Sequence, residues 1–452
     1  MAMDRREFLH RCACAGLGAG AFGTTMLSFE HAAAQAAPDY RALVCVFLFG
    51  GNDAFNMFVP RSSAEASVYA ASRQNLAIPS GSLVPVTATN PIAGGGEYGF
   101  HASCTELASL FDQGRLAVLG NVGPLVAPVT RAGYLARTAQ LPPQLFSHND
   151  QQKHWQTSRP DSRLNTGWLG RMADVLAAGT TGQQVAINMS VSGQNLIQYG
   201  ETTIPYTLST QGITTLRGLN SSNATNARRL AAFNQLRDAT VDHPIPREFA
   251  NIQRRNQQNA ETLTAALEAI QLATVFPQTG AGAQLSMVAR LIGARTALSA
   301  RRQAFMVSVG GWDTHGEQAV RHPQLLQQLS QALNAFYLAL NELQATDLVT
   351  TFTASDFGRT LTSNGDGTDH GWGSHHVIMG AAVRGRNVYG TMPSLMIDGP
   401  DDTRGGRLIP STAVDQYGAT LARWMGVTDP QLAAVFPNLG RFASSDLGFM
   451  NP

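Results

Sequence analysis

Eight consecutive apolar residues, ALVCVFLF at positions 42–49, constrain the fold more than any other segment of this 452-residue chain. A strand that is apolar on both sides must be buried on both faces, and such strands are typical of parallel sheets in α/β domains. The run stops at Gly50-Gly51-Asn52-Asp53, where the glycines favour a tight turn. We therefore expect residues 42–49 to form a central strand that ends beside a carboxylate.

Similar apolar segments alternate with helical patterns along the rest of the chain. Residues 115–121, 303–309 and 347–354 are predicted to be strands, with amphipathic stretches between them that are predicted to be helices. This rhythm favours an α/β fold with a central, mainly parallel sheet and helices on both faces. From about residue 167 to residue 280 the chain is more polar, and we expect a helical insertion there.

The first 36 residues have the pattern of a twin-arginine (Tat) export signal. Arg5-Arg6 precedes a weakly apolar run, and Ala34-Gln35-Ala36 has the small-x-small pattern of a cleavage site. The run is too short to span a bilayer as a stable helix, so we expect no stable membrane anchor, with a retained signal as the alternative. Residues 37–452 are then the mature, periplasmic or secreted domain, and the Tat translocase is its partner during export.

Charge and cysteine content exclude several classes of protein. A formal net charge of +1, with 14% charged residues, provides no field that would favour nucleic acid. Beyond the signal only Cys45 and Cys104 remain, too few for a disulfide-rich scaffold, and two buried thiols are expected rather than one bridge. Partners must therefore be inferred from a local site.

Seven of the eleven histidines fall in three short windows, at residues 148–154, 315–322 and 370–376, each just after a predicted strand or in the loop beyond it. Ligands in open α/β sheets bind at the carboxyl ends of the strands. Imidazoles and carboxylates without cysteine suit a catalytic divalent metal better than a structural zinc site. We expect one or two divalent ions (Zn, Mn, Mg, Fe or Ca), with candidate ligands Asp53, Asp313, His315, Asp356, Asp369, His370, His375 and His376.

Two of these windows need a finer interpretation. Because neighbours on an extended chain face opposite ways, only one of His375 and His376 is expected to bind. His322 precedes a proline and is expected in a loop or a cap.

Ser147 begins a predicted helix that runs to about Thr157. The free N–H groups of a helix start favour an anion, and a hydroxyl there is well placed to attack one. His148 is the alternative as a ligand or general base, bound water is a third choice of nucleophile, and Ser147 alone would be no more than a cap. Lys153, the only lysine, and Arg359 are candidate clamps for an anion.

These motifs together resemble the Tat-exported bacterial family catalogued as domain of unknown function 1501. The resemblance runs in order from about Leu43 to Pro393 and is carried by FLFGGND, LFSHNDQQKHWQT, TGWLGR, GGWDTH, SDFGRT, DHGWGSHH and the glycine-tyrosine-proline pattern of residues 385–393. That family looks like a distant branch of the alkaline phosphatase and sulfatase superfamily. The resemblance implies metal ligands at Asp53, Asp313, Asp356 and the closing histidines, and a nucleophile at Ser147 or His148.

Some positions depart from the superfamily pattern. Asp313-x-His315 replaces the usual Asp-x-x-x-His, and Phe357 stands where histidine or asparagine is usual. The Cys-x-Pro-x-Arg signature is absent around Cys104, which argues against a formylglycine sulfatase. The resemblance implies a metal-dependent hydrolase of phosphate or sulfate esters, acting on a small anionic ester. The alternatives are a non-catalytic binding protein of the same fold, stabilised by metal, and a redox or other metal-cofactor protein.

Overall fold

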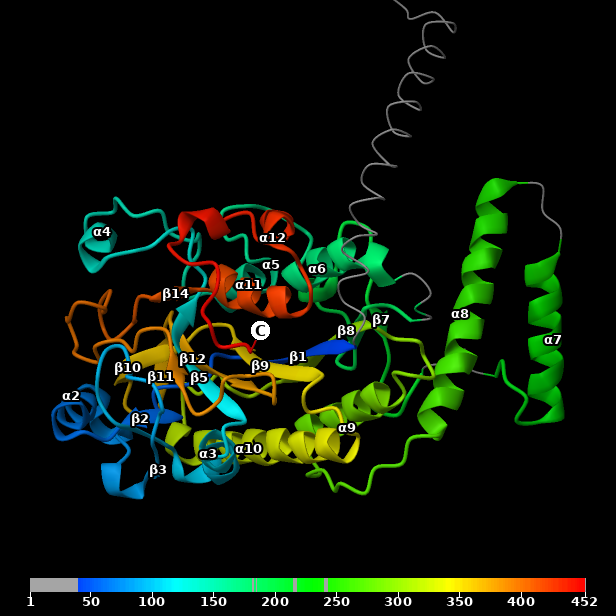
Figure 1. Cartoon of the computed structure of the whole chain (residues 1–452). Coiled ribbons are helices and arrows are strands. Elements are labelled where there is room, and N and C mark those ends of the chain that lie inside the picture. Colours follow the sequence, from blue (N-terminus) through cyan, green and yellow to red (C-terminus); the bar gives the residue numbers. More distant parts are fainter. Residues whose placement is uncertain (1–39, 181–182, 184, 214–217, 240–242, 452) are drawn as a thin grey trace, which may run out of the picture.

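A nine-stranded sheet forms the centre of the molecule (Figure 1). The computed structural model describes residues 40–451, except 181–182, 184, 214–217 and 240–242, so the expected signal peptide lies outside the described residues. The strands run in the order β13-β5-β12-β9-β1-β8-β6-β7, and β14 pairs with β5. Their bounds are β1 Arg41–Leu48, β5 Leu116–Gly123, β6 Asn188–Ser190, β7 Tyr206–Thr207, β8 Arg302–Val309, β9 Val349–Ser355, β12 Ser374–Met379, β13 Val388–Tyr389 and β14 Thr412–Ala413.

The strand β1 is the predicted central strand. It pairs in parallel with β8 on one side and with β9 on the other, so that Leu48 lies beside both Val309 and Ser355. Its side chains alternate between two core clusters, with Val44 and Val46 in one and Cys45 and Phe47 in the other. The expected mainly parallel sheet is therefore confirmed, and only β12 runs antiparallel to its neighbours, β5 and β9.

Helices cover both faces of the sheet, as predicted (Figure 1). Below it in this view lie α3 (Thr105–Asp112), α9 (Gly280–Gly293) and α10 (Gln318–Glu342). Above it lie α5 (His148–Thr157), α6 (Trp168–Leu176), α11 (Val414–Trp424) and α12 (Asp429–Val435). The two expected thiols, Cys45 and Cys104, are free and buried, as predicted.

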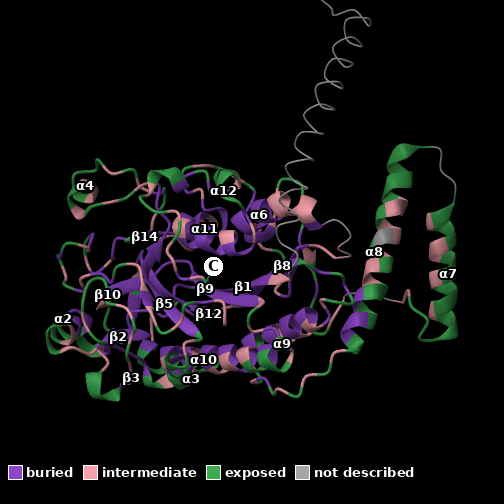
Figure 2. Cartoon of the chain, in the orientation of Figure 1, coloured by how far each residue is buried: buried purple, intermediate pink, exposed green. Residues whose placement is uncertain are grey.

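The expected insertion between residues 167 and 280 consists of two different parts. Its first part belongs to the core, because α6 is mostly buried and β6 pairs with β8 in the main sheet. The second part is a hairpin of α7 (Ala224–Asp238) and α8 (Pro244–Glu268), which projects from the side of the molecule opposite to β10 and β11 (Figure 1). No residue of α7 is buried (Figure 2).

Smaller elements complete the carboxyl edge of the sheet. A two-stranded sheet of β10 (Arg359–Ser363) and β11 (Thr368–His370) follows β9 directly. The helix α2 (Ser63–Arg73) packs against β10. A three-stranded sheet of β2 (Phe58–Pro60), β3 (Val84–Val86) and β4 (Tyr98–Phe100) lies next to α2, where β2 contacts the helix. The short helix α4 (Arg131–Leu135) lies apart from them in a loop. Among the described residues, no helix combines the length and apolar composition needed to cross a membrane.

Candidate metal centre

The loops that follow β1, β8 and β9 meet at one edge of the sheet, because the three strands are parallel and end in register. Their backbones approach closely at Gly50 and Gly51, which have φ values of 118° and 88°. A Cβ atom at Gly50 would lie 2.3 Å from the backbone nitrogen of Asp313, and one at Gly51 would lie 2.5 Å from the Phe357 ring. Only glycine allows the three loops to come together here.

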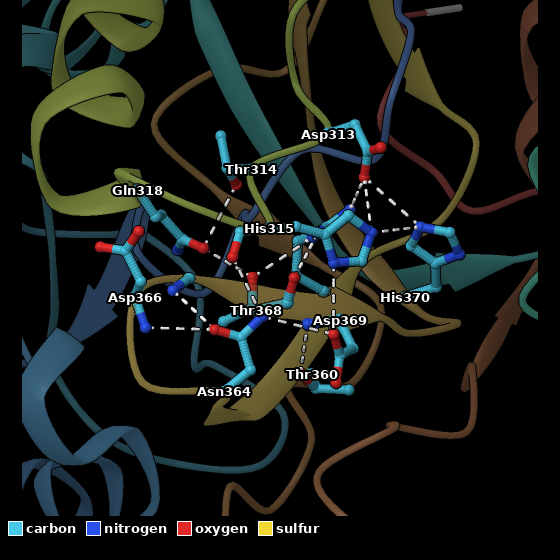
Figure 3. Close-up of polar contacts among 12 residues, drawn as sticks. Asp313, Thr314, His315, Gln318, Thr360, Asn364, Asp366, Thr368, Asp369 and His370 are labelled. Atoms are coloured by element: carbon cyan, nitrogen blue, oxygen red, sulfur yellow. Dashed lines mark hydrogen bonds and ion pairs between the residues drawn. The ribbon is translucent and has the colours of Figure 1, made fainter.

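Three imidazole rings gather around the carboxylate of Asp313, which is 44% exposed. Figure 3 shows His315 and His370, whose Nε2 atoms lie 3.1 Å and 3.3 Å from Oδ1 of Asp313. The third ring, His148 at the start of α5, places Nε2 3.4 Å from Oδ2 of Asp313. One ligand atom each from His148, Asp313 and His370 fits within 4.8 Å. We call these four residues the Asp313 cluster.

In each of the three rings, the other nitrogen is held by an oxygen acceptor. Nδ1 of His148 donates to Asp356 at 2.6 Å, and Nδ1 of His315 donates to Asp369 at 3.2 Å (Figure 3). Nδ1 of His370 donates to the backbone carbonyl of Phe146 at 2.7 Å. A ring nitrogen that donates to a carboxylate or a carbonyl carries the proton of the neutral imidazole. All three Nε2 atoms therefore face Asp313. In the neutral His370 ring, whose Nδ1 donates to a carbonyl, Nε2 carries the lone pair and accepts from Nε2 of His315 at 2.8 Å.

Burial and charge perturb the ionisation of this cluster. The hydrogen bond to Asp356, strengthened by its charge, raises the pKa of His148, whereas burial lowers the pKa of His370. Partial burial acts to raise the pKa of Asp313, but its hydrogen bond and charge pair with Arg359 prevail and lower it. The cluster thus keeps an ionised carboxylate beside a neutral His370.

Arg359 lies fully buried behind Asp313. Its Nη1 donates to Asp313 at 2.7 Å and to the Gly50 carbonyl at 3.1 Å, while Nε and Nη2 donate to the side chain and carbonyl of Thr368. These contacts do not support the expectation that Arg359 clamps a substrate anion, because its donors face protein oxygens. Lys153, the other expected clamp, is half-buried on α5 and belongs to no ion pair among the described residues.

Asp53 does not join the Asp313 cluster. Its carboxylate is fully buried, and Oδ2 accepts hydrogen bonds from Arg73 and from Nε2 of Gln318. The other oxygen, Oδ1, is buried and has no hydrogen-bond partner in the described part of the chain. Asp356 is also fully buried, but it faces the cluster through His148 and accepts a second hydrogen bond from Gln152 at 2.8 Å.

The structure does not support the expectation that His375 or His376 closes the site. Nδ1 of His375 accepts a hydrogen bond from the Asn121 backbone at 3.0 Å, and the His376 ring packs edge-on against Trp155 at 5.0 Å. Both rings are buried in β12, and burial lowers the pKa of each to about 3. Alternation along the strand does send them to opposite faces, and both act as neutral core residues.

At the start of α5, Ser147 and His148 play different structural parts. The Ser147 hydroxyl donates to Asp150 at 2.7 Å and makes no capping bond to the helix backbone. His148 is the residue that reaches the cluster, and its ring packs 4.8 Å from that of Phe357. The Phe357 ring also stacks on that of His370, with ring centres 4.6 Å apart, so that an apolar ring packs against both His148 and His370.

Sequence reasoning missed three residues of the surroundings. Gln152 lies four positions after His148 on the same helix face, and this spacing could have revealed it. Gln318 and Arg73, which hold Asp53, come from the start of α10 and the end of α2. His322, expected in a loop or cap, is instead buried in α10, with Nε2 3.1 Å from the Asn52 side chain.

Several solved structures are distantly similar to this chain. Ps i-CgsB in complex with k-i-k-neocarrahexaose has a TM-score of 0.33 and 8% identity, covering 87% of this chain and 74% of that one. A protein from a core genetic locus of Bacteroides thetaiotaomicron for glycosaminoglycan metabolism has a TM-score of 0.33 and 10% identity. This match also covers 87% of this chain and 74% of that one. A mutant of the alkaline phosphatase PafA has a TM-score of 0.26 and 12% identity, and the match covers 72% of this chain and 64% of that one.

Comparison at the level of sequence gives one family. No curated protein matches the chain. The profile of one family, described as a protein of unknown function (DUF1501), matches residues 40–431. This range contains every residue of the Asp313 cluster.

Proposed function

We propose a metal-dependent hydrolase activity for this chain, which belongs to the DUF1501 family of proteins of unknown function. The substrates would be phosphate or sulfate esters, the class that the resemblance of its motifs implies. The carrying observation is the convergence of three imidazole Nε2 atoms on Asp313, each with its Nδ1 bound to an oxygen acceptor. Neutral imidazoles and a carboxylate are the ligand set of catalytic zinc, manganese and iron sites.

Distances within the cluster support an ion at this place. The Nε2 atoms of His315 and His370 are 2.8 Å apart, and they lie 3.1 Å and 3.3 Å from Oδ1 of Asp313. Ligands bonded to one ion at about 2.1 Å are separated by roughly 3.0–3.4 Å in octahedral or tetrahedral geometry. A cation that replaces the proton between the two nitrogens would take both of them and the carboxylate oxygen as ligands.

The bound ion would supply charge stabilisation for the transferring group and a lowered pKa for a coordinated water. The residues of this chain would hold the ion and fix the orientation of its ligands. Asp356 and Gln152 fix the His148 ring, because Asp356 accepts hydrogen bonds from both His148 and Gln152, so that Nε2 of His148 would face the ion. The Ser147 hydroxyl donates to Asp150 and does not contact the cluster, so we propose a coordinated water rather than Ser147 as the nucleophile.

A second candidate function is a non-catalytic, metal-stabilised binding protein. The observation in its favour is that His315 belongs to the loop after β8, whereas His370 ends β11. An ion between them would tie two loops together whatever else it did. Measured turnover separates this candidate from the hydrolase, because both predict bound metal.

Export by the Tat route is part of the proposal. It rests on Arg5-Arg6 and the cleavage pattern at Ala34-Gln35-Ala36, which lie outside the described residues. The Tat translocase would carry the folded chain, and the mature protein would work in the periplasm or outside the cell.

The test uses full-length exported protein purified without chelator. We expect bound divalent metal, hydrolysis of an aryl phosphate or aryl sulfate, and a lower Tm after chelation. His370→Ala should lose metal and turnover together, whereas His243→Ala, an exposed histidine at the start of α8, should keep both. Metal-free protein that melts identically with and without chelator would contradict the proposal, and bound metal without turnover would favour the binding protein.

A further inference from the structure

The carboxylate of Asp53 follows the central strand, where the motif resemblance implies a metal ligand, but a guanidinium already neutralises it. The side chains of Asp53 and Arg73 are both 0% exposed, and their ion pair is direct. Gln318 donates to the same oxygen of Asp53, and its own Oε1 accepts from Thr368 at 2.6 Å. Asp53 is therefore held through Oδ2 by two donors, whereas its Oδ1 has no hydrogen-bond partner in the described part of the chain.

Arg73 is fixed independently of Asp53. It is the last residue of α2, and its Nη1 donates to the backbone carbonyls of Thr360 at 2.8 Å and Leu361 at 3.3 Å, both in β10. Two carbonyl oxygens of β10 thus bind one end of the guanidinium, while its Nη2 donates to Asp53. A buried cation with three protein acceptors cannot leave without exposing an unpaired carboxylate, which is costly.

Arg359 repeats this arrangement at the neighbouring loop. It is 0% exposed, is held by Gly50 and Thr368, and pairs with Asp313. Each of the two strand-end carboxylates, Asp53 after β1 and Asp313 after β8, thus has its own buried guanidinium. They differ in exposure and in ion pairs. Asp313 is 44% exposed and lies within 3.4 Å of three imidazoles, whereas Asp53 is 0% exposed and forms no ion pair with a histidine in the described part of the chain.

The balance of charge indicates how many ions this edge of the sheet can hold. Four carboxylates contact the two buried arginines or the imidazoles of the cluster, and the arginines leave two negative charges when the imidazoles bind a metal as neutral ligands (Asp53, Asp313, Asp356, Asp369; Arg73, Arg359). One divalent cation removes this excess. A second divalent cation, placed at Asp53, would leave two uncompensated positive charges beside the fully buried Arg73, which is unfavourable.

We infer that the centre takes a single divalent cation per chain, at the Asp313 cluster, and that Arg73 permanently occupies the position of a second cation at Asp53. This inference rests on the proposed metal dependence and fixes its stoichiometry. Asp53 is then a structural partner of Arg73 rather than a metal ligand.

The experiment titrates chelator-treated mature protein with Zn²⁺ by calorimetry and measures the metal retained after gel filtration. We count only sites tighter than about 1 μM, which excludes weak surface binding. The wild type should bind one ion, Asp53→Asn should also bind one, and Asp313→Asn should bind at least a hundredfold more weakly. Two tight ions in the wild type, or loss of the single ion in folded Asp53→Asn, would overturn the inference.

Asp53→Asn leaves Arg73 without its charge partner and is expected to lower Tm. If that variant does not fold, the double variant Asp53→Leu with Arg73→Met removes both charges together, a change that buried ion pairs often tolerate. It should fold and bind one Zn²⁺, and a folded double variant without tight Zn²⁺ would again contradict the inference. A wild type that binds no ion would instead remove the proposed function, so the two failures are distinct.

Discussion

The backbone carbonyl of Phe146 accepts the Nδ1 proton of His370 at 2.7 Å, and Phe146 does so with a left-handed backbone, φ 71°. Such a conformation is unfavourable for a bulky residue and is found where surrounding contacts enforce it. Here the guanidinium of Arg407 lies over the Phe146 ring, with its Cζ atom 5.0 Å from the ring centre. Nε of Arg407 donates to the backbone carbonyl of His370. His370 is thus oriented by the main chain, whereas His315 and His148 are oriented by carboxylates.

Because Asp369 orients His315 through a side chain, mutation can test it directly. Asp369→Ala should weaken metal binding by about 10-fold to 100-fold, the usual cost of losing the partner of a ligating histidine. Asp369→Asn keeps an acceptor oxygen, so its metal affinity should lie between those of Asp369→Ala and the wild type. Competition with a chelator of known affinity measures the effect, and equal affinities for all three proteins would show that His315 does not bind the metal.

Ser147 and His148 are expected to respond differently to substitution. Ser147→Ala should keep its metal and its turnover within about threefold, because the hydroxyl contacts Asp150 rather than the cluster. His148→Ala should lose bound metal and about a hundredfold in turnover, because its Nε2 faces Asp313 in the cluster. Steady-state kinetics with an aryl ester decides this. The opposite pattern, with Ser147→Ala inactive and metal still bound, would identify Ser147 as the nucleophile.

Asp415 in the first turn of α11 predicts how stability depends on pH. Burial raises its pKa to about 7, so between about pH 4 and pH 7 the folded chain holds a proton that the unfolded chain has lost. The free energy of unfolding should therefore fall as pH rises through this window, by at most about 4 kcal/mol, and level off above it.

Thermal melts of Asp415→Asn test this dependence. The variant lacks the titrating group, so its Tm relative to the wild type should increase from pH 5 to pH 8. Asp429→Asn is the matched control, because its carboxylate, on α12, is 75% exposed. Parallel Tm curves for Asp415→Asn and the wild type would show that Asp415 ionises freely in the folded protein.

Export can be tested without knowledge of the substrate. Replacing Arg5 and Arg6 together by lysine should leave the precursor in the cytoplasm, because the paired guanidinium groups form the signal that the export receptor recognises. Fractionation followed by immunoblotting measures the distribution. Efficient export of the double variant would rule out the Tat route.

The sheet could be predicted because its strands carry their own signal. An uninterrupted apolar run gave β1, and segments rich in apolar and β-branched residues gave β8 and β9. The parallel direction followed from burial on both faces. The direction of β12 had no such signal, since a six-residue strand looks the same in either orientation.

The candidate site was predicted in part, for similar reasons. Asp313, His315 and His370 follow strand ends or lie in the adjoining loops, and parallel strands bring such residues together. The partner of Asp53 could not be predicted. Arg73 ends a helix with no motif of its own, and its position depends on how α2 packs against β10.

The position of β1 in the sheet has a consequence for how the chain folds. Arg41 pairs with Arg302 and Ala42 with Val349, so the first strand finds its two neighbours only 261 and 307 residues later. Contacts so distant in sequence form slowly, and during synthesis an apolar strand without partners is prone to aggregation. Since β9 ends at Ser355, the centre of the sheet must close late, after most of the chain has left the ribosome. A translocase that accepts finished, folded proteins suits a chain whose first strand waits this long for its partners.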